Sequence, residues 1–196
     1  MEHKYLRLLG IVLVVVSVYL LSFSMVVFHY PIYEKFILQY SADKTTAELQ
    51  TKNIISYFQG KEELRGFTKP EADHLKDARF VIWLLILVLI FSIIGLFLIK
   101  DQKAMVYGGL LSLIIPLILY AIPFELLFNY FHFIFFPQGN WMFDTNSVLI
   151  QMYPIDFFYG FFKDIILRGF IFGIVITIVF SMKFLKHKIY FTLQQN

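Results

Sequence analysis

Long apolar runs that lack charged residues are the main feature of the hydropathy pattern. Three runs, 8–28, 80–99 and 104–124, carry no charge at all, and each is long enough for a helix to cross the ~30 Å hydrocarbon core of a bilayer. The fourth run, 165–182, includes Arg168 near one end, where a long basic side chain can reach the headgroups. Because a backbone inside lipid must satisfy its own hydrogen bonds, we expect four transmembrane helices. The first run is too long for the core of a typical signal peptide, so we expect it to remain as a helix.

Lysine and arginine are concentrated in the short segments on one side of these four spans. The positive-inside rule predicts that this side, with both termini, is cytoplasmic. The long segments on the other side, 29–79 and 125–164, then form an extracytoplasmic cap. The basic residues on the predicted cytoplasmic side are Lys4, Arg7, Lys100, Lys103, Lys183, Lys186 and Lys188.

The predicted fold class is therefore an all-α integral membrane protein with four transmembrane helices and a mostly helical extracytoplasmic cap. Its parts are an N-terminal segment with the first transmembrane helix (1–29), the first part of the cap (30–79), the second transmembrane helix (80–99), a cytoplasmic turn (100–103), the third transmembrane helix (104–124), the aromatic-rich second part of the cap (125–164), the fourth transmembrane helix (165–184) and a cytoplasmic tail (185–196).

Local signals predict short helices in the first part of the cap. Residues 46–58 favour a helix that ends near Gly60. Thr68 and Glu71 have the spacing of a capping box, and Pro70 between them is allowed in a first helical turn. The helix that they open runs without a breaker into the second span.

The second part of the cap is harder to assign. If the helix of the third span continues past Pro123, then Glu125, Asn129 and His132 lie on one face of it. Residues 137–140 then form a turn. The irregular pattern of residues 141–153 allows one short strand pair, and a further helix is expected to start near Pro154 and run into the fourth span.

Composition excludes several classes of function. Apolar residues make up 59% of the 196 residues and charged residues only 16%. In soluble proteins, apolar residues make up ~45–50% and charged residues ~25%, so this composition indicates a membrane protein. The chain has no cysteine, which excludes disulfides, thiolate metal sites and a cysteine nucleophile. The net charge of +3 is too small to indicate a nucleic-acid partner.

Three histidines, His29, His74 and His132, lie close to the predicted outer membrane boundary, each at the end of a span. His132 is surrounded by phenylalanines, among which an unpaired imidazole would be costly to bury. No two histidines stand three to five residues apart and no HExxH motif occurs, so we predict no metal site. A serine nucleophile elbow and a glycine-rich phosphate loop are also absent.

Aromatic residues are concentrated around His132. Fifteen of the 39 residues from 124 to 162 are Phe, Tyr or Trp, out of 38 aromatic residues in the chain. An interfacial belt needs only a few aromatic residues at each helix end. This density therefore favours a lined cavity suited to acyl chains.

Two groups of motifs resemble the bacterial lipoprotein intramolecular transacylases. The first is Glu71-Ala-Asp-His74-Leu-Lys-Asp77, and the second includes Phe131-His132-Phe-Ile-Phe-Phe136, Gly139-Asn-Trp-Met-Phe-Asp144 and Tyr153-Pro-Ile-Asp-Phe-Phe158. The resemblance covers essentially the whole chain. It implies an enzyme of the bacterial cell membrane that acts on diacylated lipoproteins and moves the sn-2 acyl chain to the α-amine of the N-terminal cysteine. It also implies that His74 and His132 are catalytic.

The residue types agree with such a reaction. An intramolecular transfer brings its own ester and nucleophile, so we predict no cofactor. The predicted partners are the diacylated lipoprotein substrate and membrane lipids, and the sequence does not give the oligomeric state. Our working assignment makes His132 the base and His74 its partner in proton transfer or carbonyl polarisation, and the residues leave the reverse order open. The alternative is a non-catalytic membrane scaffold whose aromatic cap binds a partner. Candidate substrate-binding residues are Asn129, Phe131, Phe135, Trp141, Asp144 and Tyr153.

Overall fold

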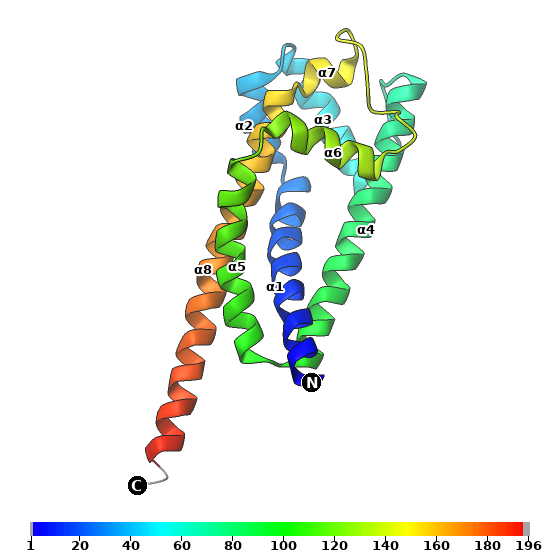
Figure 1. Cartoon of the computed structure of the whole chain (residues 1–196). Coiled ribbons are helices and arrows are strands. Elements are labelled where there is room, and N and C mark those ends of the chain that lie inside the picture. The colour runs from blue at the N-terminus through cyan, green and yellow to red at the C-terminus, as the bar shows by residue number, and fades with distance from the viewer. Residues whose placement is uncertain (1, 194–196) are drawn as a thin grey trace. The chain divides into compact units, whose positions relative to one another are not determined.

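The protein is helical throughout its regular structure. The structure, a computed structural model, describes residues 2–193, with side chains described for residues 3–183. The predicted tail, including the side chains of Lys186 and Lys188, falls outside the described side chains. The helices of the described chain are α1 (Glu2–Val27), α2 (Tyr30–Tyr40), α3 (Lys44–Phe58), α4 (Lys69–Ile99), α5 (Gln102–Tyr120), α6 (Phe124–Phe135), α7 (Val148–Met152) and α8 (Ile155–Leu193) (Figure 1).

Four of the described helices, α1, α4, α5 and α8, are long and apolar enough to cross a membrane. The predicted all-α membrane fold with four spans is therefore confirmed. The chain divides into two compact units, each considered by itself below. The span unit comprises Met1–Ser22, Ile86–Ala121 and Ile166–Asn196, and the cap unit comprises Phe23–Leu85 and Ile122–Ile165.

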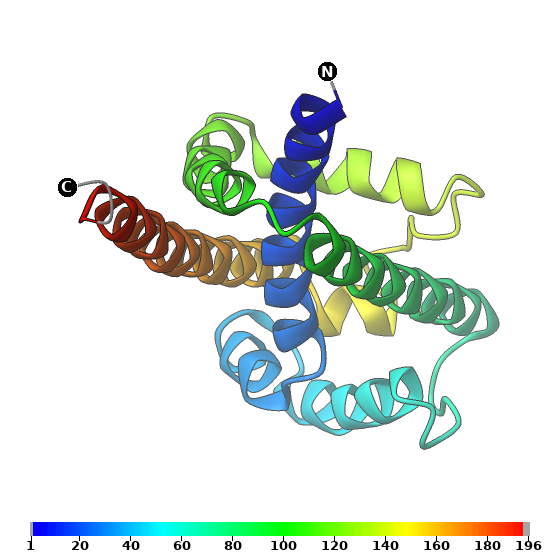
Figure 2. The same cartoon turned by 90° about the horizontal axis from the view of Figure 1, so that it is seen from below.

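Glycines allow close helix packing within the span unit, where α1 lies among parts of α4, α5 and α8 (Figure 2). A Cβ on Gly108 of α5 would meet Val14 of α1, and a Cβ on Gly169 of α8 would meet the ring of Tyr19. Small residues at such contacts let helix backbones approach, which is how helices pack in lipid. The Tyr19 hydroxyl donates to the Ser112 carbonyl at 2.7 Å and satisfies its polar end.

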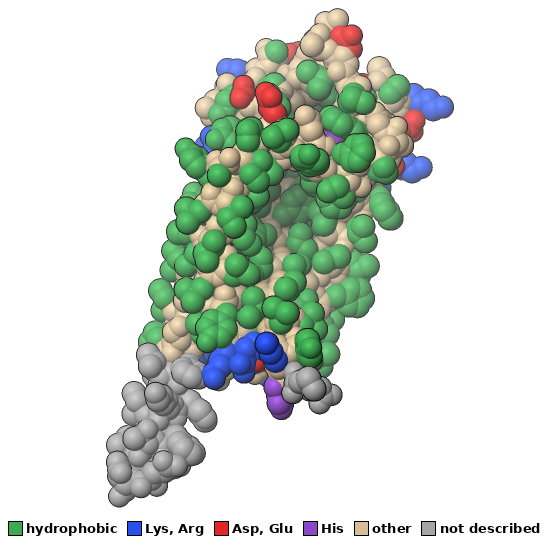
Figure 3. All heavy atoms as spheres, viewed as in Figure 1, with side chains coloured by type: hydrophobic (Ala, Val, Ile, Leu, Met, Phe, Trp, Pro, Cys, Tyr) green, Lys and Arg blue, Asp and Glu red, His purple; other side chains and the backbone are tan. Residues whose placement is uncertain are grey.

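The turn between α4 and α5 is held by one acidic residue. Asp101 is the N-cap of α5, and its carboxylate accepts hydrogen bonds from the backbone N–H groups of Lys103 and Ala104. The same carboxylate pairs with Arg7 of α1 at 2.8 Å. Figure 3 shows lysine and arginine side chains gathered at this end of the span unit, beside the hydrophobic surface of the helices.

The core of the cap unit is built from α2, α3, α7 and the first turns of α8. Helix α2 packs on α3, and α3 on α7 (Figure 1). The rings of Tyr33 and Phe36 on α2 contact Phe157 and Phe161 on α8. As the sequence indicates, α3 covers residues 46–58. It is capped by Asp43 and ends before Gly60, whose φ of 75° suits a residue without a side chain.

The structure decides two points that the sequence leaves open in the second part of the cap. The helix of the third span ends at Tyr120, and α6 starts afresh after its N-cap, Pro123. A proline disfavours helical geometry in the residue before it, which here is Ile122, and provides no N–H to extend a helix.

No strand pair forms within residues 141–153 of the described chain. Instead, the backbone carbonyl of Asp144 accepts from the Ser147 N–H at 2.9 Å, and its carboxylate accepts from the Asn146 N–H at 3.0 Å. This turn leads directly into α7, so the segment bends back before it can extend as a strand. The following helix, α8, starts at Ile155 as expected.

Candidate active site

Two histidines from separate helices meet in the cap unit. His74 lies on the polar first turns of α4, six residues before the apolar run 80–99 and therefore outside the membrane-spanning segment predicted from the sequence. His132 lies on α6. Their ring centroids are 6.2 Å apart and the ring planes are inclined by only 24°, so the two imidazoles stack.

Aromatic side chains surround both imidazoles. Phe136 and Phe143, from the segment after α6, lie 4.8 and 5.6 Å from the ring of His74, measured between centroids. Phe128 and Trp141 lie 4.1 and 4.7 Å from the ring of His132, which is only 8% exposed. The sequence-based expectation of an aromatic environment for His132 is confirmed, and it extends to His74.

A backbone carbonyl sets the tautomer of His132. Nδ1 of its ring lies 2.8 Å from the carbonyl oxygen of Phe128, one helical turn earlier on α6. A carbonyl oxygen can only accept, so Nδ1 carries the proton and donates it. In the neutral ring Nε2 therefore keeps its lone pair and can accept a proton.

Both imidazoles are held in the neutral form. Burial, together with the neighbouring His132, lowers the pKa of His74 from 6.5 to about 4, against the opposing effects of Asn140 and Asp77. Burial also lowers the pKa of His132, and the Phe128 carbonyl partly offsets this. At neutral pH the pair therefore offers one free base and one neutral hydrogen-bonding group, with no charge to neutralise.

A buried carboxylate anchors the segment that carries the aromatic residues. Glu71, at the start of α4, is 2% exposed. One oxygen accepts from the backbone N–H and the hydroxyl of Thr68, at 2.8 and 2.7 Å, so the Glu71 side chain forms its half of the predicted capping box. The other accepts from the hydroxyl of Ser147 at 2.6 Å and from the N–H of Leu149 at 3.3 Å. Glu71 thus ties α4 to α7 and fixes one end of the connecting segment.

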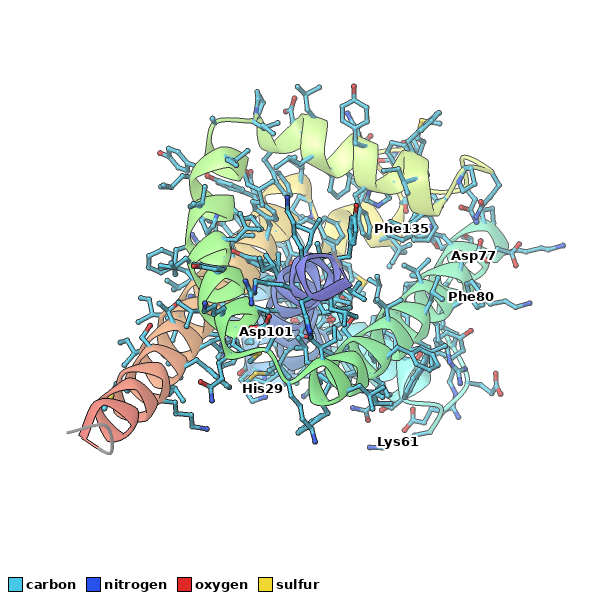
Figure 4. All side chains as sticks on the ribbon, turned by 60° about the horizontal axis from the view of Figure 1, so that its bottom comes forward. His29, Lys61, Asp77, Phe80, Asp101 and Phe135 are labelled. Carbon is cyan, nitrogen blue, oxygen red and sulfur yellow. The ribbon has the colours of Figure 1, made fainter. Side chains whose placement is uncertain are left out.

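Asp77 anchors the other end of this segment. Its Oδ2 atom accepts hydrogen bonds from the side-chain amides of Gln138 and Asn140, at 2.8 and 2.6 Å. Figure 4 shows Asp77 on α4 next to the segment that follows α6, with Phe135 at the end of that helix. The segment is therefore fastened to α4 on both sides of Trp141 and Phe143.

Three of the predicted substrate-binding residues lie close to the pair. Trp141 contacts His132 directly, and Phe131 lies 5.4 Å from the same ring. Phe135 packs against Phe131, one turn along α6.

The other three predicted residues occupy different positions. Asn129 is exposed on α6, and Asp144 is exposed in the turn that it caps. Tyr153 is buried, and its hydroxyl is hydrogen-bonded to that of Thr51 in the core of the cap unit. His29, the third histidine near the predicted boundary, is exposed at the start of α2 and caps that helix without a side-chain hydrogen bond.

Sequence reasoning did not assign a role to the residues that surround and support the pair. Phe128 could have been found from its position four residues before His132 on a helix. Phe136 and Phe143 carry no signal beyond their aromatic character, and the roles of Asp77 and Asn140 depend on a contact between residues 63 positions apart. Among the described residues, no three metal-binding side chains come together.

The fold defines an integral membrane protein, and its cap unit contains a neutral histidine pair surrounded by aromatic side chains. The family model of the lipoprotein intramolecular transacylase Lit matches residues 6–158. The chain belongs to this family, which confirms the resemblance seen in the sequence motifs.

Solved structures share the fold of this chain, and one curated protein is similar to it in sequence. The membrane-integral lipoprotein intramolecular transacylase Lit from Bacillus cereus, solved in meso, has a TM-score of 0.73 at 20% identity, covering 96% of this chain and 98% of that one. A variant of that protein with one histidine replaced by arginine matches with a TM-score of 0.72 at 19% identity, covering 96% of this chain and 95% of that one. An uncharacterized protein of Aquifex aeolicus (strain VF5) is 32% identical over 133 residues. This alignment covers 63% of the present chain and 62% of the relative.

Proposed function

We propose that this protein is an intramolecular transacylase that moves the sn-2 acyl chain of a diacylglyceryl lipoprotein to the α-amine of its N-terminal cysteine. The observation that carries the proposal is the stacked pair of His74 and His132, 6.2 Å apart, in a chain of the transacylase family. The substrate supplies both the ester and the nucleophile. The protein has to provide a base, a hydrogen-bond donor and a confined space.

His132 is proposed as the base. The α-amine attacks the sn-2 ester carbonyl, so that a C–N bond forms and a tetrahedral intermediate develops. Nε2 of His132, left free by the bond from Nδ1 to the Phe128 carbonyl, accepts the proton that the amine loses. The same proton then passes to the departing sn-2 oxygen as the C–O bond breaks. The products are an amide on the cysteine and a free hydroxyl on the glyceryl group, which is the lyso form.

His74 is proposed to polarise the ester carbonyl. As a neutral imidazole it can donate one N–H to the oxygen on which negative charge develops in the intermediate. Its low pKa, about 4 because of burial and the nearby His132, keeps it in this neutral state.

The aromatic surroundings are proposed to hold the reacting groups together. Orientation of two groups in one molecule can contribute up to ~7–11 kcal/mol to a reaction barrier. Trp141 and Phe131, which border His132, are the closest candidates for contacts with acyl chains. Phe135, Asn129, Asp144 and Tyr153 remain predicted substrate contacts from the sequence.

The orientation in the membrane is also part of the proposal. By the positive-inside rule, the basic residues at the turn between α4 and α5 and around Arg7 support a cytoplasmic location for that end of the span unit. The cap unit and the histidine pair then face the outside of a bacterial cell membrane, where diacylated lipoproteins are displayed.

A direct test uses the purified protein in lipid nanodiscs with a synthetic diacylated lipopeptide and no other component. Mass spectrometry of the N-terminus distinguishes the N-acylated lyso product from the starting diacyl form. Removal of a general base typically lowers a rate by about a hundredfold to ten-thousandfold. His132→Ala and His74→Ala should therefore each reduce product formation by at least the lower value.

His29→Ala is the matched control, because it removes an exposed histidine from the same unit. We expect it to leave the rate unchanged. Product formation by both site variants at the wild-type rate would refute the histidine mechanism. A wild-type protein that forms no product would refute the enzymatic function and favour a scaffold.

A further inference from the structure

Three residues of α4, Glu71, His74 and Asp77, follow one another at intervals of three and therefore lie on one side of the helix. The outer two are carboxylates, and both bind the segment between α6 and α7. The histidine between them contacts the rings of Phe136 and Phe143, which belong to the same segment. One side of α4 therefore holds a histidine of the pair together with the segment that surrounds it.

The two carboxylates hold this segment in different ways. Glu71 is 2% exposed, so its hydrogen bonds lie in the interior of the cap unit and stabilise its fold. Asp77 instead binds Gln138, which is exposed, and Asn140, which is partly exposed. Because water competes for such bonds, they add little to stability. The bonds of Asp77 therefore matter more for where the segment lies than for whether the cap unit folds.

The two amides that bind Asp77 flank a tight turn between two rings of the site. Gly139, between the two amides, has a φ of 76°, and its N–H donates to the Phe136 carbonyl at 3.0 Å. The ring of Phe136, before the turn, contacts both histidines. Trp141, directly after the turn, lies 4.7 Å from the ring of His132, measured between centroids. The position of this turn therefore sets the positions of both aromatic rings.

We propose that Asp77, by holding this turn, keeps Trp141 against His132 and is therefore a positioning residue for acyl transfer. The inference rests on the proposed function. His132 is only 8% exposed beneath Trp141 and the neighbouring rings. When the turn is released from α4, water reaches the base and the acyl chain loses one wall of its site. The rings on α6 keep their own contacts, so substrate binding changes less than the chemical step.

The first measurement is acyl transfer by the purified full chain in nanodiscs with a synthetic diacylated lipopeptide. A displacement of about 1 Å in an active site can cost about a hundredfold in rate, so Asp77→Ala should lower kcat by up to this factor, with a smaller change in KM. Asp77→Asn should restore most of kcat. Both amides bond to the single atom Oδ2, and the amide oxygen of asparagine can take its place. The matched control is Asp73→Ala, which removes a charge from an exposed position about one turn earlier on α4 and should leave kcat unchanged.

The second measurement follows the position of Trp141 independently of activity, by ¹⁹F NMR of the full chain labelled with 5-fluorotryptophan. The chain has two tryptophans, and Trp141→Phe assigns their signals. In Asp77→Ala the Trp141 signal should shift or broaden. Trp83, whose indole N–H donates to the Phe58 carbonyl at 2.9 Å, should keep its signal. Both tryptophans belong to the cap unit, so a general loss of its structure would change both signals.

A double-mutant cycle tests the contact from its other side. Asn140→Ala removes one of the two donors and should lower kcat less than Asp77→Ala, because Gln138 still binds the carboxylate. The two changes break the same hydrogen bond, so their effects should not add. The double variant should therefore lose little more kcat than Asp77→Ala alone.

Wild-type kcat in Asp77→Ala would overturn the proposal, as would an unchanged Trp141 signal, a change in both tryptophan signals, or fully additive losses in the cycle. If the Trp141 signal responds as expected but the wild type forms no product, Asp77 still positions Trp141 and the proposed function fails. The two ideas can therefore fail separately.

Discussion

Replacing Glu71 with glutamine changes a single buried atom at the point where α4 and α7 are joined. The carboxylate accepts four hydrogen bonds, from the N–H and hydroxyl of Thr68, the hydroxyl of Ser147 and the N–H of Leu149. Glutamine keeps the shape but has one oxygen and one NH₂ group. In either orientation of the glutamine side chain, its NH₂ group faces one hydroxyl and one backbone N–H that both donated to an oxygen in the wild type.

Each side holds one hydroxyl, which can rotate and accept, and one backbone N–H. The less costly orientation places the NH₂ group towards Ser147 and Leu149, because the bond from the Leu149 N–H, at 3.3 Å, is the longest of the four. The N–H of Leu149 is then left without an acceptor, which costs about 1–3 kcal/mol for a buried group. The remaining bonds also lose the assistance of the negative charge, which adds roughly 1 kcal/mol. We therefore expect Glu71→Gln to lower the free energy of unfolding by about 2–4 kcal/mol.

The pH dependence gives a second, independent signature. Burial opposes ionisation, but the hydrogen bonds from Ser147 and Thr68 outweigh it, so the pKa of Glu71 is lowered below 4.5. A carboxyl group whose pKa is lower in the folded state stabilises the protein above its unfolded pKa. This contribution is lost as the pH falls through the folded pKa. The wild type should therefore lose stability below about pH 4.5, and Glu71→Gln should show a flatter profile there.

Denaturant titration in detergent micelles, followed by tryptophan fluorescence, measures both effects, because both tryptophans, Trp83 and Trp141, belong to the cap unit. Glu63→Gln is the control, since Glu63 is exposed and lies in the loop that leads to α4. It should change stability by no more than about 0.5 kcal/mol. Equal stabilities of the two variants would refute the role assigned to Glu71.

Three further outcomes are expected. Because burial lowers the pKa of both His74 and His132, the rate of acyl transfer should follow ionisation of the substrate amine near pH ~8. An additional inflection near pH 6.5 would contradict this. Asp101→Ala removes the N-cap of α5 and should cost about 1–2 kcal/mol in denaturant titrations, whereas Asp101→Asn, which can still cap, should cost less. Gly109→Ala places a methyl group against Thr177 and the backbone of Gly173 and should lower the melting temperature, with a cost of about 1–3 kcal/mol. Gly95→Ala meets only the movable end of Leu13 and should lower it less.

Features that depend only on residues close together in the sequence could be predicted from the sequence. Each spanning helix follows from the length of an uncharged run, because lipid leaves the backbone no other partner for its hydrogen bonds. The start of α4 follows from Thr68 and Glu71, which bond to each other three residues apart. The family, and with it the two histidines, was recognised from short motifs around His74 and His132.

Other features became visible only when distant segments were brought together. One oxygen of the Glu71 carboxylate accepts hydrogen bonds from Ser147 and Leu149, which are separated from it in sequence by 76 and 78 positions. No local sequence pattern distinguishes such a buried carboxylate from an exposed one. The break before α6 and the formation of α7 were also left open by the sequence, which allowed a continuous helix and a short strand pair there. The tautomer of His132 depends on the Phe128 carbonyl of its own helix. The aromatic surroundings of His74 depend instead on Phe136 and Phe143, from a segment that only the tertiary structure brings into contact with α4.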